Sequence, residues 1–433
     1  MSAGSGNGGA SAGLRADGTV VVVGASLAGL RAVQGFRDEE FKGRLVLVGD
    51  ELHYPYDRPP LSKQVLAGTW PPERAVLADY HKLHDLGVEV HVGRRAVSLD
   101  IEGREVALDD GTSMTADGIV VATGARARRL RGTDGADGVM VLRTLDDCER
   151  LRARLLSGGP GTRVVVVGAG FIGSEVASTC SELGCHVTVV EALPTPLAPA
   201  LGELVGAACG ALHTRHGVTL LTGVGVVAVH PPGGGEDGAA PDEGTAGRVE
   251  LDDGTNLAAD VVVVGIGVVP NTEWLDGSGL TVEDGLVCDA GLFAADGVVA
   301  AGDVARWTWR HHGQEESTRI EHWETAAQMG QAAARSLLAG RADAEPFDPV
   351  PYFWSDQYGL RIQMLGRPAP TDEVAVVDGA LDSEDGRFVA VYGRAGRLTA
   401  ALAVGRPRLL MGFRPLLVAG ASFGEALAHL PAS

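Results

Sequence analysis

Three glycines at positions 168, 170 and 173 carry the clearest chemical signal in the sequence. They form a G-x-G-x-x-G motif directly after the apolar run Arg163–Val167. Between a strand and a helix, the first glycine allows a tight turn, the second lets a pyrophosphate approach the backbone, and the third lets the helix pack on the strand. Amide groups at the helix start then attract the phosphates. An ordinary glycine-rich turn is the alternative, but the preceding strand favours a dinucleotide site.

Glu191 bears on which dinucleotide this site takes. It follows the next apolar run, His186–Val190, and residues 192–196 include no Arg or Lys. A carboxylate at this place accepts a hydrogen bond from the ribose 2′-hydroxyl of NADH and repels the 2′-phosphate of NADPH. The sequence therefore predicts a preference for NADH.

A second motif of the same kind lies near the N-terminus. The run Thr19–Val23 is followed by GASLAG at 24–29, in which Ser26 takes the place of the middle glycine and is small enough to leave room for a phosphate. Asp50 and Glu51 stand at the end of the next apolar run, where a carboxylate can bind a ribose. Two dinucleotide sites in one chain indicate a bound flavin and a diffusible nicotinamide.

These motifs need strands and helices in alternation. Continuous Val/Leu runs between helix-like stretches indicate parallel sheets that are covered on both faces. Three more apolar runs end in glycine sites: Ile119–Val121 before Thr123-Gly124, Val261–Val264 before Gly267, and Val298–Ala301 before Gly302-Asp303. Beyond about residue 340, aromatic and alternating segments follow, at Pro351–Tyr358, Arg387–Tyr392 and Leu398–Val404. The predicted fold is α/β, with two Rossmann-like dinucleotide-binding domains and a small α+β C-terminal domain.

Composition narrows the class of protein. The 433 residues are 45% hydrophobic and carry a formal net charge of −20, which argues against disorder and against nucleic-acid or anionic-membrane partners. No apolar run reaches the length of about 18 residues that a membrane helix needs, and the first residues lack the features of a signal peptide. Of the 62 glycines, some fall in the N-terminal tail and in Pro231–Gly247, which we expect to be a flexible insert.

The five cysteines are odd in number and form no C-x-x-C pair. This usage predicts a reduced, cytoplasmic protein without a disulfide framework and without a metal site.

Longer strings around these motifs resemble the FAD-dependent ferredoxin reductases of the putidaredoxin reductase and biphenyl dioxygenase reductase type, within the glutathione reductase-like superfamily. The resemblance covers nearly all of residues 19–420 and loosens after Val404. It rests on strings such as VVVGASLAGLRA, VGDELHYPYDRPPLSK, VVVVGAGFIGSEVA, GIGVVPNTEWL, AAGDVAR and PYFWSDQYGLRIQMLG. It implies an FAD-binding domain at 19–125 and 258–330, an NAD-binding domain at 126–257 and an interface domain at 331–433. The composition of residues 1–18 indicates a loose N-terminal tail before them.

The resemblance also implies a catalytic pair. Lys63 would lie near flavin N5, and Glu175 would sit beside it and face the nicotinamide. An ammonium group there stabilises negative charge that develops on the ring, and a partly buried lysine in turn needs a carboxylate partner. A purely structural ion pair is the alternative.

Further residues are implied to bind the two cofactors. Val97 would contact the adenine end, Arg143 the phosphate side, Asp303 the ribityl chain and Trp323 the isoalloxazine edge. The full implied set is Gly24, Ala28, Gly29, Asp50, Glu51, Arg58, Lys63, Val97, Thr123, Gly124, Arg126, Arg143, Gly168, Gly170, Ile172, Gly173, Glu191, Gly267, Gly302, Asp303 and Trp323.

Two features bear on the electron acceptor. Related disulfide reductases carry redox-active cysteine on the helix after the first strand, but residues 29–40 contain none, so electrons should leave from the flavin to a one-electron iron–sulfur acceptor. Six arginines and no acidic residue occur in Arg387–Gly424, and Arg306–His312 reads as a basic, aromatic loop. Both segments could dock an acidic ferredoxin, or the first could be a solvated face.

The predicted activity is that of an FAD-dependent NAD(P)H:ferredoxin oxidoreductase that uses NADH. It would serve a haem monooxygenase or an iron–sulfur oxygenase, as a monomer or weak homodimer. One alternative is a reductase of small acceptors, of the monodehydroascorbate- or oxygen-reducing type. Another is a non-catalytic, NADH-sensing flavoprotein similar to relatives of apoptosis-inducing factor.

Overall fold

A parallel sheet of buried valines forms the centre of the first compact unit of the chain. The computed structural model describes residues 13–133, 135–136, 138–230, 247–312 and 314–429. The central sheet has the strand order β19-β20-β7-β1-β2-β3, and only β19 runs antiparallel to its neighbour. Its strands are β1 (Thr19–Val23), β2 (Arg44–Gly49), β3 (Val88–Val92), β7 (Gly118–Val121), β19 (Phe293–Ala295) and β20 (Val298–Ala300). The first predicted parallel sheet is confirmed.

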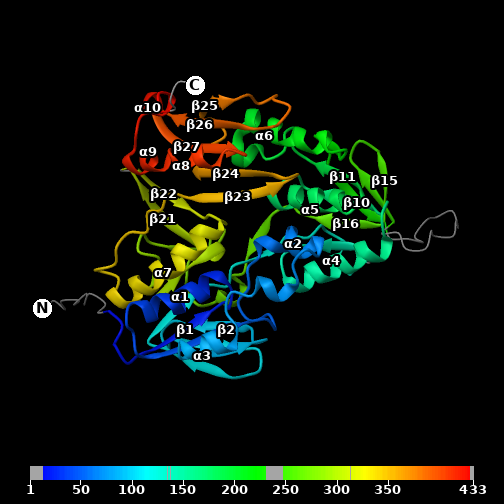
Figure 1. The fold of residues 1–433 in the computed structure, drawn as a ribbon. Helices are drawn as coiled ribbons and strands as arrows, with labels where there is room; N and C mark the ends of the chain where they lie inside the picture. The colour runs from blue at the N-terminus through cyan, green and yellow to red at the C-terminus, as the bar shows by residue number, and fades with distance from the viewer. Residues whose placement is uncertain (1–12, 134, 137, 231–246, 313, 430–433) are drawn as a thin grey trace, which may run out of the picture. The chain divides into compact units, whose positions relative to one another are not determined.

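Two helices pack together in this unit, α1 (Leu27–Asp38) and α7 (Trp323–Ala339), and they run close to one another in Figure 1. Gly330 permits the close approach, because a Cβ atom there would stand 2.3 Å from the carbonyl oxygen of Ala28. The predicted boundary between residues 330 and 331 falls inside α7, which belongs to the first unit throughout. The remaining elements of the unit are α3 (Tyr80–Asp85), β4 (Ala96–Asp100), β5 (Glu105–Leu108), β6 (Ser113–Thr115), β18 (Leu286–Cys288), β21 (Ala305–His311), β22 (Gln314–Thr318), η3 (Glu273–Leu275) and η4 (Gly302–Val304).

The segment that reads as a basic loop, Arg306–His312, is strand β21 up to His311, so that prediction is wrong. Alternate side chains point inward, and Trp307 and Trp309 are buried in the core. Arg306 pairs with Asp284 at 3.5 Å, and the neighbouring Arg310 pairs with a glutamate of β22. The aromatic residues therefore stabilise the sheet and form no docking surface.

The prediction of a loose tail over residues 1–18 is also wrong where the structure describes it. The backbone amide of Leu14 donates to the carbonyl oxygen of Leu337, and Arg15 pairs with Asp117 at 2.9 Å. Residues 1–12 and most of the predicted insert, 231–246, lie outside the described residues.

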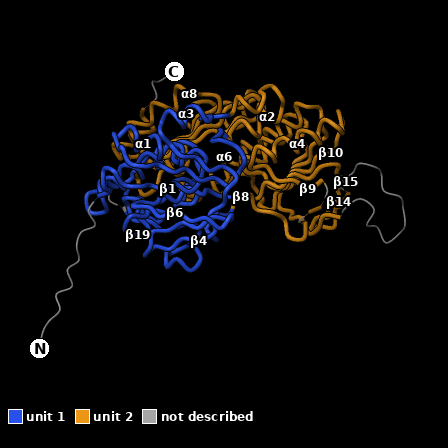
Figure 2. The backbone as a smooth tube through the Cα atoms, turned by 90° about the horizontal axis from the view of Figure 1, so that it is seen from below, with its two compact units in different colours: residues 1–57, 76–126, 269–349 blue, residues 58–75, 127–268, 350–433 orange. Residues whose placement is uncertain are grey.

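The second compact unit, orange in Figure 2, combines residues 58–75, 127–268 and 350–433. The first unit holds residues 1–57, 76–126 and 269–349. A parallel sheet of order β12-β11-β10-β16-β9 forms one part of the second unit and confirms the second predicted βαβ arrangement. Its elements are β9 (Val139–Val141), α4 (Leu145–Gly158), β10 (Arg163–Val167), α5 (Phe171–Glu182), β11 (His186–Glu191), α6 (Ala198–Arg215), β12 (Thr219–Thr222) and β16 (Val261–Val264). A small antiparallel sheet adds β13 (Val226–His230), β14 (Gly247–Leu251) and β15 (Asn256–Ala259).

Residues 58–75 belong to this second unit, although residues 76–126 of the first unit separate them in the sequence from the rest of it. They form η1 (Pro59–Ser62), α2 (Gln64–Ala67) and η2 (Pro72–Ala75). The thiol of Cys148 donates to the carbonyl oxygen of Leu61 at 3.1 Å, and the hydroxyl of Thr179 donates to that of Ser62 at 2.7 Å. These bonds hold the segment against α4 and α5. The short strands β8 (Ala125–Ala127) and β17 (Val268–Pro270) lie where the chain leaves and re-enters the first unit.

The C-terminal part of the second unit is a five-stranded antiparallel sheet of order β23-β24-β27-β26-β25, which confirms the predicted α+β domain. Its three inner strands, β24, β27 and β26, are buried on both faces, because one face packs on residues of α6 and the other on three short helices. The elements are β23 (Tyr352–Gln357), β24 (Leu360–Gly366), β25 (Glu373–Gly379), β26 (Phe388–Arg394), β27 (Arg397–Val404), α8 (Pro407–Met411), α9 (Arg414–Ala419) and α10 (Phe423–Leu427).

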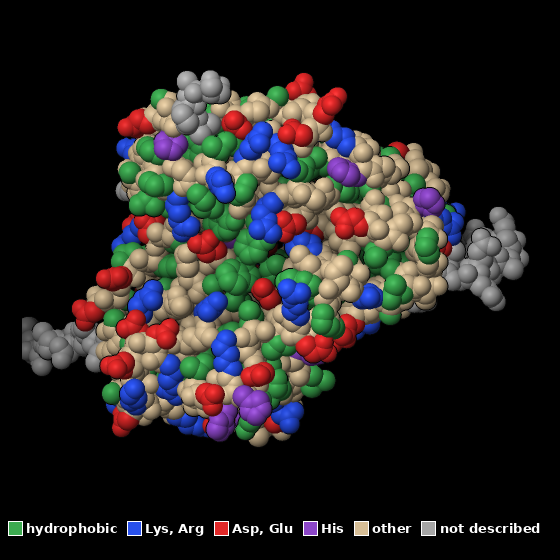
Figure 3. Space-filling model, in the orientation of Figure 1, with side chains coloured by type: hydrophobic (Ala, Val, Ile, Leu, Met, Phe, Trp, Pro, Cys, Tyr) green, Lys and Arg blue, Asp and Glu red, His purple; other side chains and the backbone are tan. Residues whose placement is uncertain are grey.

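The arginine-rich stretch Arg387–Gly424 lies in this sheet and its helices. Acidic residues outside the stretch neutralise part of its charge, since Arg394 pairs with Asp372 at 2.6 Å and Arg406 pairs with Asp378 at 3.1 Å. Figure 3 shows acidic and basic side chains intermixed over the C-terminal part of the chain. No helix among the described residues is long and apolar enough to span a membrane.

Candidate active site

An ion pair between Lys63 and Glu175 is the most buried charged contact among the candidate site residues. The Nζ atom of Lys63 lies 2.7 Å from Oε2 of Glu175, and the two side chains are 11% and 3% exposed. Glu175 lies on α5, and Lys63 joins η1 to α2. The proximity that the resemblance implied is therefore confirmed.

Both oxygens of the Glu175 carboxylate accept hydrogen bonds, and Lys63 is only one of the donors. Oε2 also accepts from the hydroxyl of Ser62 at 2.5 Å. Oε1 accepts from the hydroxyl of Ser355 at 2.8 Å and from the backbone amide of Asp356 at 3.2 Å. A buried charge is costly unless it is paired and hydrogen-bonded, and this site meets both conditions. Nothing in the spacing of the sequence points to Ser355 or Asp356, because β23 lies far along the chain from α5.

The G-x-G-x-x-G motif has the geometry that a pyrophosphate needs. Gly168 has a φ of +99°, which favours glycine. A Cβ atom at Gly173 would stand 2.0 Å from the carbonyl oxygen of Gly168, so the helix can pack on the strand only without a side chain. At Gly170 the nearest such contact is 4.0 Å away, which leaves its backbone open. The residues present therefore fit a dinucleotide phosphate.

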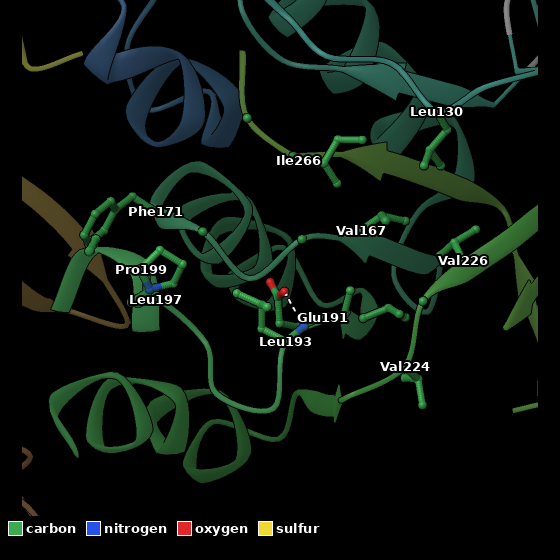
Figure 4. Close-up of a pocket in the computed structure, with 18 residues that line it drawn as sticks. Leu130, Val167, Phe171, Glu191, Leu193, Leu197, Pro199, Val224, Val226 and Ile266 are labelled. Atoms are coloured by element: carbon green, nitrogen blue, oxygen red, sulfur yellow. Dashed lines mark hydrogen bonds between the residues drawn. The ribbon is translucent and has the colours of Figure 1, made fainter. Parts of the chain in front are cut away.

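A pocket of about 510 Å³ opens beside this motif (Figure 4). Gly168, Gly170, Glu191 and Gly267, which the sequence singled out, all line it. Phe171, which the sequence did not single out, lines it as well, whereas the neighbouring Ile172 is 48% exposed and is not among the lining residues. Gly267 has a φ of +94°, which favours glycine.

The carboxylate of Glu191 is fixed at the wall of this pocket (Figure 4). Its Oε2 accepts from the backbone amide of Ala169 at 2.7 Å, and its Oε1 accepts from that of Leu193 at 2.9 Å. The lone pairs that remain can accept from ribose hydroxyl groups, while the negative charge opposes a phosphate at the same place.

We expect kcat/KM for NADH to exceed that for NADPH by about 100-fold, because two like charges side by side cost several kcal/mol. Glu191→Gln removes the charge and should narrow the ratio to about tenfold. Glu250→Gln makes the same change in β14, outside the pocket lining, and should leave the ratio as it is. Equal kcat/KM values for both nucleotides in the wild type would contradict this role of Glu191.

A second glycine cradle lies in the first unit. Gly24 has a φ of +124°, and a Cβ atom at Gly29 would stand 1.9 Å from the carbonyl oxygen of Gly24. Gly302 has a φ of +77°, and a Cβ atom at this position would stand 2.9 Å from the Cβ atom of Ala28. The structure thus brings Gly24, Ala28, Gly29 and Gly302 together, and this backbone arrangement fits the pyrophosphate of FAD.

Thr123, Gly124 and Arg126 meet around Asn271, a residue that the sequence did not single out. The amide of the Asn271 backbone donates to the carbonyl oxygen of Gly124 at 3.0 Å, and its side-chain nitrogen donates to that of Thr123 at 2.9 Å. Arg126 donates to the Asn271 side chain at 3.2 Å and pairs with Glu273 at 2.5 Å. The only sequence signal for Asn271 is its place in the family-like string GIGVVPNTEWL.

Each of the other candidate residues has its own surroundings in one of the two units. In the first unit, the indole nitrogen of Trp323 donates to Asp57 at 2.5 Å, and Glu51 accepts from the hydroxyl of Tyr56. The backbone oxygen of Asp303 accepts from an arginine, Asp50 is exposed, and Val97 on β4 is 44% exposed. In the second unit, Arg58 donates to the carbonyl oxygen of Arg143 at 2.6 Å.

His213 joins α6 to the helix that carries Glu175. It is 1% exposed, and its ring nitrogens lie 2.7 Å from the hydroxyl of Tyr358 and 3.2 Å from that of Ser174. Burial, and secondarily the nearby His216, lowers the pKa of His213 from 6.5 to about 4. The folded protein therefore holds this ring neutral at pH values where the unfolded chain protonates it.

This difference predicts acid sensitivity. The stabilisation by neutral His213 is fully present above pH 6.5 and is lost as the pH falls from 6.5 toward 4. Between pH 7 and pH 5, the free energy of unfolding should fall by about 2 kcal/mol through this residue. In urea titrations, His213→Gln should show a smaller fall over the same interval than the wild type. An identical fall in both proteins would contradict the assignment.

Comparison with known proteins shows the family of the chain. Residues 18–330 match the family model described as pyridine nucleotide-disulphide oxidoreductase, and residues 352–432 match the reductase C-terminal model. The chain belongs to the pyridine nucleotide-disulphide oxidoreductase family, and it is an oxidoreductase of this family, which uses FAD and NAD(H).

Two of its relatives match nearly the whole chain. The ferredoxin–NAD(+) reductase component of the anthranilate 1,2-dioxygenase system of Burkholderia cepacia is 38% identical, with 93% of this chain and 94% of the relative covered. Putidaredoxin reductase of Pseudomonas putida is 32% identical, with 91% and 90% covered. The solved covalent complex of putidaredoxin reductase with putidaredoxin has a TM-score of 0.84 at 30% identity, covering 94% of both chains.

Proposed function

We propose that the chain is an NADH-dependent ferredoxin reductase, which takes electrons from NADH and passes them singly to a small iron–sulfur ferredoxin. The ferredoxin would serve a haem monooxygenase or an iron–sulfur oxygenase. The observation that carries this proposal is the buried Lys63–Glu175 pair, because its Glu175 lies on α5, the helix that begins at the wall of the pocket beside the G-x-G-x-x-G motif. The ferredoxin reductases among the relatives, and the absence of cysteine from residues 29–40, support it.

Bound FAD would supply the conversion between two-electron and one-electron transfer. Gly24, Ala28, Gly29 and Gly302 would hold its pyrophosphate, and Asp50 or Glu51 its ribose. Val97, Arg143, Asp303 and Trp323 would hold the parts of FAD that the resemblance assigns to them. Thr123, Gly124, Arg126 and Arg58 complete this proposed set.

Lys63 would provide a fixed positive charge where the nicotinamide gives up its hydride, and Glu175 keeps that ammonium group in place. The motif glycines and Glu191 would hold NADH at the start of α5, and Ile172 and Gly267 complete its proposed binding set. Since Glu175 lies one turn further along the same helix, nucleotide binding and charge placement share one element.

The domain plan and location belong to the same proposal. We infer an FAD-binding domain that begins at residue 19, an NAD-binding domain and a C-terminal interface domain. The predicted bounds at 257/258 and 330/331 are replaced by 268/269 and 349/350, because β16 belongs to the parallel sheet of the second unit and α7 belongs to the first unit. The described cysteines are all free thiols, and four of the five are buried, which supports a cytoplasmic location.

An anaerobic experiment tests the function. The FAD-loaded protein is reduced with NADH, and cytochrome c reduction is then followed with and without added ferredoxins. The proposal expects cytochrome c reduction that depends strictly on a ferredoxin. In a parallel assay in air, rapid oxygen consumption without ferredoxin would instead favour a reductase of small acceptors. In the anaerobic assay, a long-lived complex of the reduced protein with NAD⁺ would favour the non-catalytic alternative.

The arginine-rich stretch makes a salt prediction. Arg408 on α8 is exposed, and electrostatic steering of an acidic ferredoxin by such groups weakens with ionic strength. Ferredoxin-dependent turnover should therefore fall steeply between low and high salt, while NADH oxidation by ferricyanide should not. Arg408→Gln should flatten the salt response, whereas Arg310→Gln, which alters an exposed, paired arginine of β21, should not. Equal salt responses with both acceptors would contradict a docking role.

A further inference from the structure

A row of three contacts joins β23 of the C-terminal sheet to α5. At one end the rings of Phe353 and Phe171 lie 4.5 Å apart. At the other end the backbone amide of Tyr358 donates to the hydroxyl of Ser178 at 2.8 Å. Between these two contacts, Ser355 reaches Glu175. Positions 171, 175 and 178 have the spacing of one helix face, so the strand runs along that face of α5.

The middle contact is polar although its surroundings are buried. Ser355 is fully buried, and Gln357, which donates to the Ser355 hydroxyl at 3.0 Å, is 1% exposed. A serine at a buried position of a strand contributes little apolar packing, so its hydrogen bonds dominate what it does. Ser355 therefore acts chiefly through the Glu175 carboxylate, with Gln357 behind it fixing the direction of its hydroxyl.

The donors divide between the two carboxylate oxygens in a way that fixes its orientation. Lys63 and Ser62 occupy Oε2, while Ser355 and the amide of Asp356 occupy Oε1. The terminal torsion of a glutamate is broad and only weakly restricted by itself. Donors on both oxygens therefore hold the carboxylate plane, and the Oε1 donors keep Oε2 directed at the lysine.

We propose that Ser355 is a positioning residue for the Lys63–Glu175 pair, so that the C-terminal domain takes part in the reaction with NADH and not only in binding the electron acceptor. This inference rests on the proposed function, because it assumes that the pair acts when NADH reduces FAD.

The test is single-turnover reduction of the FAD-loaded protein by NADH without oxygen and without ferredoxin. In Ser355→Ala, the limiting rate should fall about tenfold, the effect of removing one hydrogen bond to a charged group. The NADH concentration at half the limiting rate should stay the same, because the nucleotide pocket is unaltered. Ser355→Thr keeps a hydroxyl and should recover most of the rate.

Ser178→Ala is the matched control. It also converts a buried serine to alanine and also removes one hydrogen bond between α5 and the chain at the end of β23, but it does not touch Glu175. Its limiting rate should match the wild type. Equal slowing in both variants, with equal losses of Tm or of bound FAD, would show a structural role and overturn the proposal, as would an unchanged rate in Ser355→Ala.

The same measurement separates this inference from the proposed function. If NADH does not reduce the FAD of the wild-type protein, both the proposed function and the positioning role are overturned. Normal wild-type reduction with an unaffected Ser355→Ala variant would overturn the positioning role alone.

Discussion

Lys63→Ala should be reduced by NADH about 100-fold more slowly than the wild type in single-turnover mixing, the loss typical when a preorganised donor is removed from a developing negative charge. The Nζ atom of Lys63 is fixed by the buried Glu175 at 2.7 Å, so its charge needs no rearrangement during the reaction. Lys82→Ala, which removes an exposed lysine of α3, is the control and should react at the wild-type rate. Unchanged reduction of Lys63→Ala would exclude the lysine from the reaction.

Stability has to be separated from rate in this experiment. Removing one partner of a buried pair leaves the other charge without its counter-ion, which typically costs about 3–5 kcal/mol. The double variant Lys63→Met with Glu175→Gln leaves no such charge and should recover most of the lost Tm. Its reduction by NADH should stay slow, because the ammonium group is still missing. Recovery of both properties together would mean that the pair is purely structural.

The second and third glycines of the nucleotide motif should respond in opposite ways to alanine. In Gly173→Ala, the new methyl group would stand 2.0 Å from the carbonyl oxygen of Gly168, where neither backbone can move freely. We expect a loss of about 3 kcal/mol, which lowers Tm by roughly 6–12 °C for a unit of this size.

Gly170→Ala has room for its methyl group, and the φ of −74° at this position is one that alanine adopts. Its free energy of unfolding should stay within about 0.5 kcal/mol of the wild type. The methyl group projects where the pyrophosphate approaches the backbone, so KM for NADH should rise about tenfold. Thermal melts and initial rates on both variants check the pair of predictions. A wild-type KM in Gly170→Ala would place the phosphates elsewhere.

Local patterns predicted the strands made of continuous β-branched residues better than a strand of mixed composition. The runs Thr19–Val23 and Arg163–Val167 become β1 and β10 with the expected bounds, because continuous β-branched residues suit a strand covered on both faces. In Arg306–His312, the charges and aromatic rings suggested a loop, but the alternation of Trp307 and Trp309 with polar residues is the period of a strand.

The site was less accessible to local reasoning. The glycine motifs could be predicted because the residues that make room for a pyrophosphate lie close together in the sequence, within one turn. The contact of Lys63 with Glu175 came from resemblance to a family, since no spacing rule links residues so far apart. Ser355 and Asn271 had no signal beyond their places in the family-like strings, because their partners are set by how segments far apart in the sequence pack.

The membership of residues 58–75 in the second unit limits how parts of such reductases can be exchanged. Consider a chimera that takes residues 126–257 from one parent and all other residues from a second parent. Cys148 and Thr179 would come from the first parent, whereas the segment 58–75, to which they must hydrogen-bond, would come from the second. Lys63 and Glu175 would then come from different parents as well. A graft that keeps these contacts within one parent has three pieces of chain, 58–75, 127–268 and 350–433, and swapping a single continuous block would separate them.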